Sequence, residues 1–242
     1  MSTTNIGGSA SIAAPEYWWY RARADLLRTA LGSYVVDAER VLDVGSADGP
    51  SVGWLQASGR KTALDIDPRG LGPGGVCGSA LQLPFRSGCF DVVAAFDVLE
   101  HCEPEQVAVA ELARVLAPGG RLLLSVPAYQ WAWSDFDEEN GHHRRYTRRR
   151  LVGAVEGAGL EVERTTYAFT SVFPFFAAER LLRRVRRRRG PDAPADIVSL
   201  PEVSPLVERM LLRLAGLDQA LLDRRDLPFG SSVLLAASKA PT

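Results

Sequence analysis

The sequence contains no apolar run long enough to cross a membrane as a helix. The longest mostly apolar stretch of the 242 residues, Ala168 to Ala178, is well short of the about 20 residues that such a helix needs. The first 15 residues also lack the basic region and the apolar segment of a secretory signal peptide. We therefore expect a cytoplasmic protein that has no transmembrane segment.

Cysteine is scarce, and charge of neither sign is in excess. The three cysteines, Cys77, Cys89 and Cys102, lack the paired spacing of a metal site, and their odd number suits a reducing compartment. The formal net charge is only −1, so no overall field draws the protein to nucleic acid, and the composition disfavours such a partner. The length allows one α/β domain with an appended subdomain.

Short apolar stretches bounded by Gly, Pro or Asp predict strands at residues 40–44, 61–66, 75–77, 91–96, 120–126, 161–168 and 231–237. Helices are predicted between them, at residues 15–31, 50–57, 104–116 and 147–158. Strands and helices that alternate in this way form a doubly wound, mostly parallel sheet. The ligand crevice of such a sheet lies at the carboxyl ends of its strands.

The segment from Val41 to Gly49 has the pattern of a nucleoside-binding turn. A short buried strand ends at Gly45, and small residues follow at Ala47 and Gly49. A glycine directly after a strand lets the backbone approach a ligand where a Cβ would collide. Asp65 follows twenty positions after Gly45, at the expected tip of the next parallel strand, where a carboxylate can bind ribose hydroxyls.

The spacing Gly-x-Ala-x-Gly differs from the Gly-x-Gly-x-x-Gly spacing that places a pyrophosphate on a helix. Asp43, inside the strand before the turn, would repel a pyrophosphate but suits a ligand with a sulfonium and an ammonium group. Here the chain resembles the class I S-adenosylmethionine (SAM) methyltransferases. The resemblance continues in order over residues 41–126, through Ala63–Pro68, Leu83–Phe85, Phe90–Val93, Val98–His101 and Arg114–Gly120.

The resemblance implies a Rossmann-like, seven-stranded sheet whose last strand is reversed, at residues 231–237. It also implies that Asp65 binds both ribose hydroxyls and that Ile66 covers one face of the adenine. Ser79 stands where the family usually presents an aspartate to the adenine amino group, so that contact is weaker or made by a backbone carbonyl. The SAM-binding residues that we expect are Arg23, Asp43, Gly45, Ala47, Gly49, Asp65, Ile66, Ser79, Ala80, Leu81 and Phe96.

The predicted organisation has four parts: an amino-terminal helical lid (1–39), the SAM-binding core (40–168), a helical insertion that covers the acceptor (169–230), and the last core strand with its tail (231–242). In the first part, the aromatic residues Tyr17 to Tyr20 either pack on the sheet edge or form a lid from which Arg23 reaches the SAM carboxylate. The two interpretations are compatible.

The insertion contains an arginine-rich run, with seven arginines among residues 180–189. Such a run is typical of a solvated helix end, but beside apolar bands it also suits a lipid-linked or other anionic ligand, or peripheral membrane contact. Nucleic acid is a third alternative for this run. The apolar residues of the following helix also make an oligomer through the insertion an alternative.

Two polar clusters follow neighbouring strands. Asp97, Glu100 and His101 come after the fourth strand, and His142 comes after the fifth, followed by Arg144 and Arg145. We predict that His101 and His142 share one site with Asp97 and Glu100, because the carboxyl ends of parallel strands meet at one edge. The two arginines suit an anionic group of the acceptor or a solvated helix start.

Three roles remain open for Asp97, Glu100, His101 and His142: a metal-free general base, a structural role, or a site for Mg²⁺ or Mn²⁺. The metal alternative comes from a resemblance to small-RNA 2′-O-methyltransferases, which have Glu where this chain has Asp97. We expect methylation of a hydroxyl on a small molecule, sugar or lipid-linked acceptor. The alternatives are a metal-dependent RNA 2′-O-methyltransferase and a non-catalytic SAM-binding scaffold.

Overall fold

The computed structural model describes residues 16–46, 53–187 and 203–241, with side chains omitted for 183–187. These residues form a seven-stranded sheet in the order β3-β2-β1-β4-β5-β7-β6. All pairings are parallel except those of β7, which lies antiparallel between β5 and β6. The strands are β1 (Arg40–Val44), β2 (Arg60–Asp65), β3 (Val76–Cys77), β4 (Phe90–Phe96), β5 (Leu116–Pro127), β6 (Leu160–Ala168) and β7 (Ser232–Lys239). The predicted reversed last strand is therefore confirmed.

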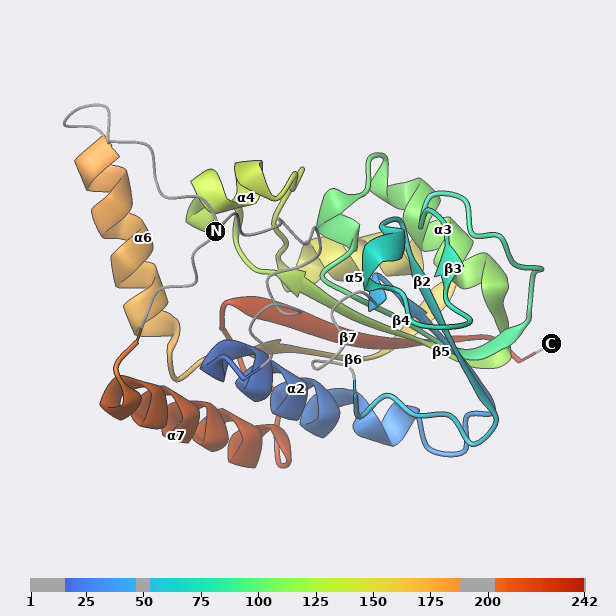
Figure 1. Ribbon diagram of the computed structural model, residues 1–242, viewed down its shortest axis with the longest axis horizontal. Coiled ribbons are helices and arrows are strands. Elements are labelled where there is room, and N and C mark those ends of the chain that lie inside the picture. Colours follow the sequence, from blue (N-terminus) through green and yellow to red (C-terminus); the bar gives the residue numbers. More distant parts are fainter. Residues whose placement is uncertain (1–15, 47–52, 188–202, 242) are drawn as a thin grey trace, which may run out of the picture.

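Helices cover both faces of the sheet (Figure 1). Helices α3 and α5 lie on one face, while α2 lies on the other with α7 outside it. Helix α6 extends away from the sheet beside the start of α7. The helices are α2 (Trp18–Leu31), α3 (Glu105–Val115), α4 (Asp135–Glu139), α5 (Arg148–Glu156), α6 (Phe173–Arg187) and α7 (Pro205–Leu222). None of the described helices is long and apolar enough to cross a membrane.

The central strands are buried on both faces, as their sequences suggest. Residues Val92 to Phe96 of β4 and Leu122 to Val126 of β5 are all buried. A near-continuous run of apolar residues is the signature of a parallel strand that helices cover on both sides. Because these strands cannot face water on either side, their polar residues of functional interest come directly after them.

One predicted helix is wrong in its described part. Residues 50–52 lie outside the described residues, and residues 53–57 form a turn followed by irregular backbone. Gly53 disfavours a helix because glycine loses more backbone entropy there than other residues do. The segment is instead held by packing, since Leu55 is fully buried and Trp54 lies 6.0 Å from Phe96 between ring centroids.

Arg164 of β6 joins three elements through its guanidinium group. Nη1 donates to the carbonyl of Ala30 near the end of α2 at 2.8 Å, and Nη2 donates to that of Leu222 at the end of α7 at 2.9 Å. Nε donates to Asp226 Oδ1 at 2.7 Å. The last carbonyls of a helix have no partner within the helix, and a cation there also matches the helix dipole. Arg164 therefore attaches α2 and α7 to the edge of the sheet.

We predict that Arg164→Met lowers the free energy of unfolding by about 2–3 kcal/mol, because it leaves two helix-terminal carbonyls without their charged donor. Chemical denaturation measured by circular dichroism checks this value. Arg60→Met is the matched control, since Arg60 is exposed at the start of β2, and it should change stability by less than about 0.5 kcal/mol. Equal effects of both substitutions would contradict the assigned role.

Candidate functional site

The carboxyl ends of β1, β2, β4 and β5 meet at one edge of the sheet, where the predicted site residues gather. Gly45 follows β1 with a φ of +74°, a backbone conformation that residues with a side chain rarely adopt. A Cβ at this position would also collide with Cγ2 of Val98. Gly45 N donates to the carbonyl of Leu64 at 2.8 Å. The turn after β1 therefore requires glycine for both conformation and space.

The acidic residues of β1 and β2 are held in different ways. Asp43 is buried, and its Oδ2 lies 3.0 Å from Nζ of Lys61 on the neighbouring strand. Asp65 ends β2, and its Oδ1 accepts a hydrogen bond from Asp67 N at 2.8 Å. Ile66, which lies between Asp65 and Asp67 in the sequence, is 74 % exposed. An exposed isoleucine at this edge offers an apolar face to a planar ligand.

The remaining expected cofactor residues lie in three settings. Ser79 Oγ accepts from Leu81 N at 3.1 Å, in a tight turn that buries Ala80. Phe96 is buried at the end of β4. Ala47 and Gly49 lie outside the described residues. The roles of all these residues in binding stay predictions.

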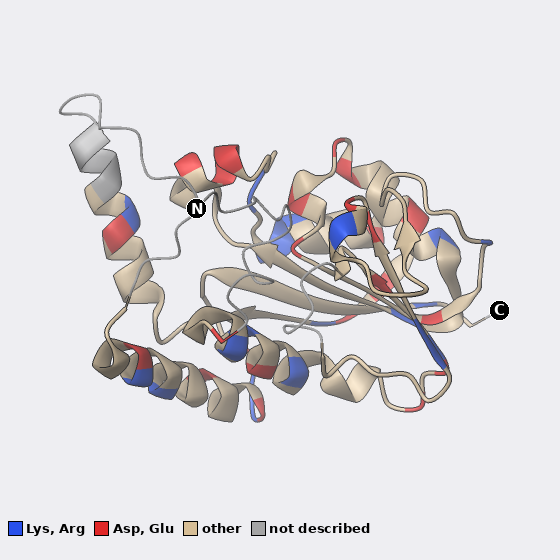
Figure 2. Ribbon diagram, viewed as in Figure 1, with Lys and Arg blue, Asp and Glu red and all other residues tan. Residues whose placement is uncertain are grey.

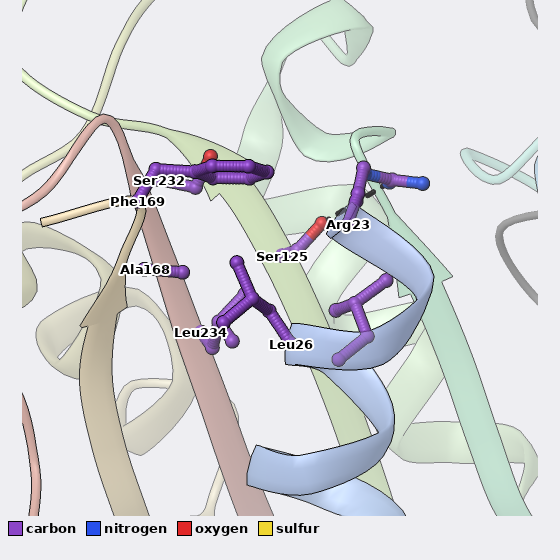
Figure 3. Close-up of a pocket in the computed structure, with 8 residues that line it drawn as sticks. Arg23, Leu26, Ser125, Ala168, Phe169, Ser232 and Leu234 are labelled. Atoms are coloured by element: carbon purple, nitrogen blue, oxygen red, sulfur yellow. Dashed lines mark hydrogen bonds between the residues drawn. The ribbon is translucent and has the colours of Figure 1, made fainter. Parts of the chain in front are cut away.

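Arg23 of α2 crosses to the end of β4 and pairs with Asp97. Arg23 Nη2 lies 2.8 Å from Asp97 Oδ2, and Ser125 Oγ donates to Asp97 Oδ1 at 2.8 Å. Figure 3 shows Arg23 and Ser125 directed toward one another beside a small cavity. The Arg23 side chain is almost fully buried, yet its Nη1 has no hydrogen-bond partner within the described part of the chain. This nitrogen is therefore able to donate a hydrogen bond to a negatively charged ligand group.

His101 and His142 lie side by side, from two segments that follow neighbouring strands. Their ring centroids are 4.6 Å apart and their planes meet at 86°. His101 ends the short 3₁₀ helix Leu99–His101 after β4, and His142 lies in the loop after α4. His143 N donates to the carbonyl of Glu100 at 2.7 Å, so backbone contact brings the two segments together.

Ligand atoms of Glu100, His101 and His142 all lie within 4.8 Å of one another. The fourth residue of the predicted cluster, Asp97, uses both carboxylate oxygens for Arg23 and Ser125. The structure thus brings three of the four predicted residues into one group and places Asp97 beside it, in a separate ion pair. Whether any of them is catalytic stays a prediction.

The two neighbours Glu100 and His101 are both shifted toward their neutral forms. Burial raises the pKa of Glu100 well above its usual range, and the charge of Asp97 raises it further. Oε2 of Glu100 finds no hydrogen-bond partner among the described residues. Burial also lowers the pKa of His101, and the nearby His142 ring lowers it further. A buried carboxyl with one oxygen left without a partner, beside a neutral imidazole, is a costly arrangement that structural needs alone do not explain.

Asp137 of α4 belongs to the polar segment that follows the fifth strand, and the sequence assigned it no role. Its side chain is fully buried, and its Oδ1 lies 2.9 Å from Nδ1 of His142 and 2.8 Å from Nε of Arg145. Burial alone would raise the pKa of Asp137, but the hydrogen bonds from His142 and Arg145 lower it to about 2. An ionised Asp137 accepts a hydrogen bond from His142 Nδ1–H, so in the neutral ring the lone pair lies at Nε2.

A sequence signal for Asp137 existed in the pair Ser134 and Asp137. Ser134 is the N-cap residue that precedes α4. Its backbone N donates a hydrogen bond to Asp137 Oδ2 at 2.9 Å, which forms a capping box. That signal predicts only a helix start. The contact with His142 depends on the loop that turns back after α4, which the sequence pattern does not show.

Arg144 and Arg145 are buried, which contradicts the solvated helix start and leaves no open anion site at them. Arg144 contacts Glu103 and the carbonyl of Cys102, while Arg145 binds Asp137 and the carbonyl of Ala128. Both guanidinium groups therefore hold the loop that carries His142. Their many donors can satisfy several acceptors that would otherwise be buried without partners.

We predict that Asp137→Asn lowers the free energy of unfolding by about 3–5 kcal/mol, because Arg145 is left buried without its carboxylate. The folded-state pKa of Asp137 is depressed, so its contribution exists above the ordinary pKa of about 3.9 and is lost as pH falls toward 2. Denaturation at several pH values between these limits checks the effect. Glu139→Gln, at an exposed position of the same helix, is the control and should leave the pH dependence unchanged.

Residues 42–124 match the family model described as a methyltransferase domain. The malonyl-[acyl-carrier protein] O-methyltransferase of Herminiimonas arsenicoxydans is 42 % identical over 92 residues, which cover 36 % of this chain and 35 % of that protein. The demethylmenaquinone methyltransferase of Mycobacterium tuberculosis (strain ATCC 25618 / H37Rv) is 34 % identical over 114 residues, which cover 44 % of this chain and 46 % of that protein. The chain thus spans about a third to a half of the length of these two relatives.

A solved structure, N-methyltransferase NodS from Bradyrhizobium japonicum WM9 in complex with S-adenosyl-L-homocysteine, is similar in fold. The likeness has a TM-score of 0.56 at 15 % sequence identity and covers 98 % of this chain and 95 % of that one. At this identity the likeness concerns the fold alone. The family model thus identifies residues 42–124 as a methyltransferase domain, and the order of the motifs and the strand order agree with the class I SAM-dependent methyltransferases.

Proposed function

We propose that this protein transfers a methyl group from SAM to a hydroxyl oxygen of a small-molecule, sugar or lipid-linked acceptor. The observation that carries the proposal is the Asp137–His142 pair beside His101, at the sheet edge where Gly45 follows β1 and Asp65 ends β2. Orientation of an imidazole by a buried carboxylate is the usual arrangement of a general base.

The residues at the edge fit SAM in three respects. Gly45, with its φ of +74°, forms a turn without a side chain at the carboxyl end of β1, where the backbone can approach a ligand. Asp65 lies at the tip of β2 with Ile66 exposed beside it, which suits a ribose and an adenine face. The unpaired Nη1 of Arg23 suits the carboxylate of the amino-acid portion. When bound, SAM supplies an electrophilic methyl group on a sulfonium.

The chain's own residues would then handle the acceptor proton. Nε2 of His142 accepts the proton of the acceptor hydroxyl, since Nδ1 is bound to Asp137. The negative charge of Asp137 stabilises the imidazolium that forms, and Arg145 keeps that carboxylate ionised and in place. Proton transfer to a positioned side chain contributes about 10²–10⁴-fold to the rate.

The acceptor class rests on less direct support. The relative from Herminiimonas arsenicoxydans is named as an O-methyltransferase, which agrees with an oxygen acceptor. After β4 the chain has acidic and imidazole groups, and it lacks the Asn/Asp-Pro-Pro-Tyr/Phe motif of many methyltransferases that act on amino groups of nucleic acids. We therefore favour a hydroxyl on a sugar, a polyketide or an isoprenoid-linked glycan.

A metal-assisted version, as in an RNA 2′-O-methyltransferase, is the second candidate. Glu100, His101 and His142 form a set of two imidazoles and one carboxylate, and the pair His142–Asp137 matches a metal ligand with its supporting acceptor. This donor set suits Mn²⁺ or Zn²⁺ better than Mg²⁺, which prefers oxygen ligands. The metal would lower the pKa of the acceptor hydroxyl. Filter binding at two salt concentrations tests RNA, because phosphate contacts make affinity depend on salt.

The first prediction of the proposal concerns the cofactor. Purified protein should bind SAM in calorimetry, and Asp65→Ala should weaken binding by about 2–3 kcal/mol, because charge-assisted bonds to the ribose are lost. Asp67→Ala is the control, since Asp67 pairs at the surface with Arg69 at 2.6 Å. Binding of NAD in place of SAM would contradict the proposal, and SAM binding without turnover on any acceptor would favour the non-catalytic scaffold.

The second prediction concerns the base. His142→Gln should lower turnover by about 10²-fold or more while SAM affinity stays within a few-fold, because only proton transfer is lost. Turnover is measured as transfer of labelled methyl from SAM to a heat-treated cell extract, with the product identified by mass spectrometry.

His143→Gln is the matched control, because His143 is exposed next to the site, and it should keep its activity. A chelator separates the two candidates: activity that is lost with it and regained with Mn²⁺ or Zn²⁺ supports the metal, while unchanged activity supports the metal-free base. A product methylated on nitrogen or carbon would contradict the proposed reaction.

A further inference from the structure

Helix α7 has a wider apolar surface than the fold uses. Its buried face, which includes Ala215 and Leu222, packs toward α2. Beside that face, Leu206, Met210 and Leu217 are 72 %, 46 % and 57 % exposed. An exposed row of large apolar side chains is uncommon on a soluble protein and indicates an interaction surface.

The exposed residues Leu206, Met210 and Leu217 form one stripe with the half-buried Leu214, which we call the α7 stripe. Their spacing of four, four and three residues places them along one side of a helix. They line a groove together with Arg209 and Arg213. The stripe is thus bordered by two cations along the same helix.

Neither Arg209 nor Arg213 has an acidic partner within the described part of the chain. The two acidic residues of α7 point elsewhere, because Glu208 lies 3.9 Å from Arg21 and Asp218 is buried against Ser171. The groove therefore combines an apolar floor with a net positive border, which matches a ligand surface that is apolar inside and anionic outside.

Helix α6 adds to the same end of the molecule. Figure 2 shows α6 and α7 at one extremity, with α6 directed away from the sheet. Phe175, Leu181 and Leu182 of α6 are 61 %, 54 % and 58 % exposed. The α6 backbone is helical to Arg187, within the arginine-rich run noted in the sequence. Helix α6 therefore carries exposed apolar residues of its own near the α7 stripe in the chain's fold.

We propose that the exposed sides of α6 and α7 dock on a lipid bilayer that contains anionic lipids, with the α7 stripe inserted at the headgroup level. Apolar side chains of an interfacial helix enter the upper acyl region while arginines contact lipid phosphates. The charge of the groove favours a bilayer over a second copy, because self-contact would bring two positive patches together. A nucleic acid supplies phosphates but no apolar surface that would cover Leu206 and Leu217.

Vesicle flotation tests this inference with the full chain. Wild-type protein should bind vesicles of phosphatidylcholine with phosphatidylglycerol, and bind pure phosphatidylcholine more weakly. Leu206→Gln/Leu217→Gln should reduce binding to the mixed vesicles at least tenfold, because both apolar insertions are lost. Arg209→Gln/Arg213→Gln should reduce it about fivefold per arginine and weaken the preference for the anionic lipid.

Two control variants carry the same types of change elsewhere: Val36→Gln, at a position that is 65 % exposed, and Arg86→Gln/Arg149→Gln, at exposed positions. Both should bind vesicles like the wild type, and circular dichroism should show that all variants are folded. The inference would be overturned if the wild type did not bind anionic vesicles. It would also be overturned if Leu206→Gln/Leu217→Gln bound them as strongly as the wild type. A dimer that the stripe variants disrupt in the absence of lipid would overturn it as well. These results do not depend on methyl transfer, so the two proposals can fail separately.

Discussion

The parallel pairing of β1 with β2 and β4, and of β4 with β5, is the constraint on which the rest of this structure depends. Strands that run in the same direction end at the same edge, so residues that follow them converge whatever their distance in sequence. Gly45, Asp65, Asp97 and the loop after β5 all reach this edge in that way. The hydrophobic core therefore organises the site indirectly, since it holds the strands in register while the site residues lie beyond them.

Buried charges hold the loop that closes the site. Asp137 binds both His142 and Arg145, and Glu105 accepts from Tyr146 at 2.7 Å and from Arg150 at 2.8 Å. Each of these carboxylates has partners that offset the cost of its burial. Glu100 is the exception among the described residues near the histidines, because its Oε2 lacks a partner and its pKa is raised. Such an exception next to two imidazoles is what a functional site tolerates and a structural core avoids.

The two proposals concern different surfaces of one molecule. The proposed methyl-transfer site lies at the carboxyl edge of the sheet, while the proposed docking surface lies on helices that precede β7 in the chain. Arg164 links them physically, because it binds the ends of α2 and α7 and lies on the sheet-edge strand β6. A membrane-docked α7 would hold the catalytic domain next to a lipid-linked acceptor, whose hydroxyl could then reach the site without leaving the bilayer surface.

The sequence by itself determined the strands, their parallel order, the reversed last strand and the convergence of His101 with His142. The reversed last strand was implied by the resemblance to the methyltransferases. The other features follow from local patterns, namely apolar runs between turn residues and polar residues directly after strands. The helix predicted at residues 50–57 was wrong in its described part, because Gly53 disfavours a helix and the packing of Trp54 and Leu55 holds the segment in an irregular conformation. Only the tertiary structure decided that Asp97 pairs with Arg23, that Asp137 orients His142, and that Arg144 and Arg145 are buried. Such pairings join residues 5 to 74 positions apart through loops whose path depends on packing, and a short sequence pattern carries no record of that path.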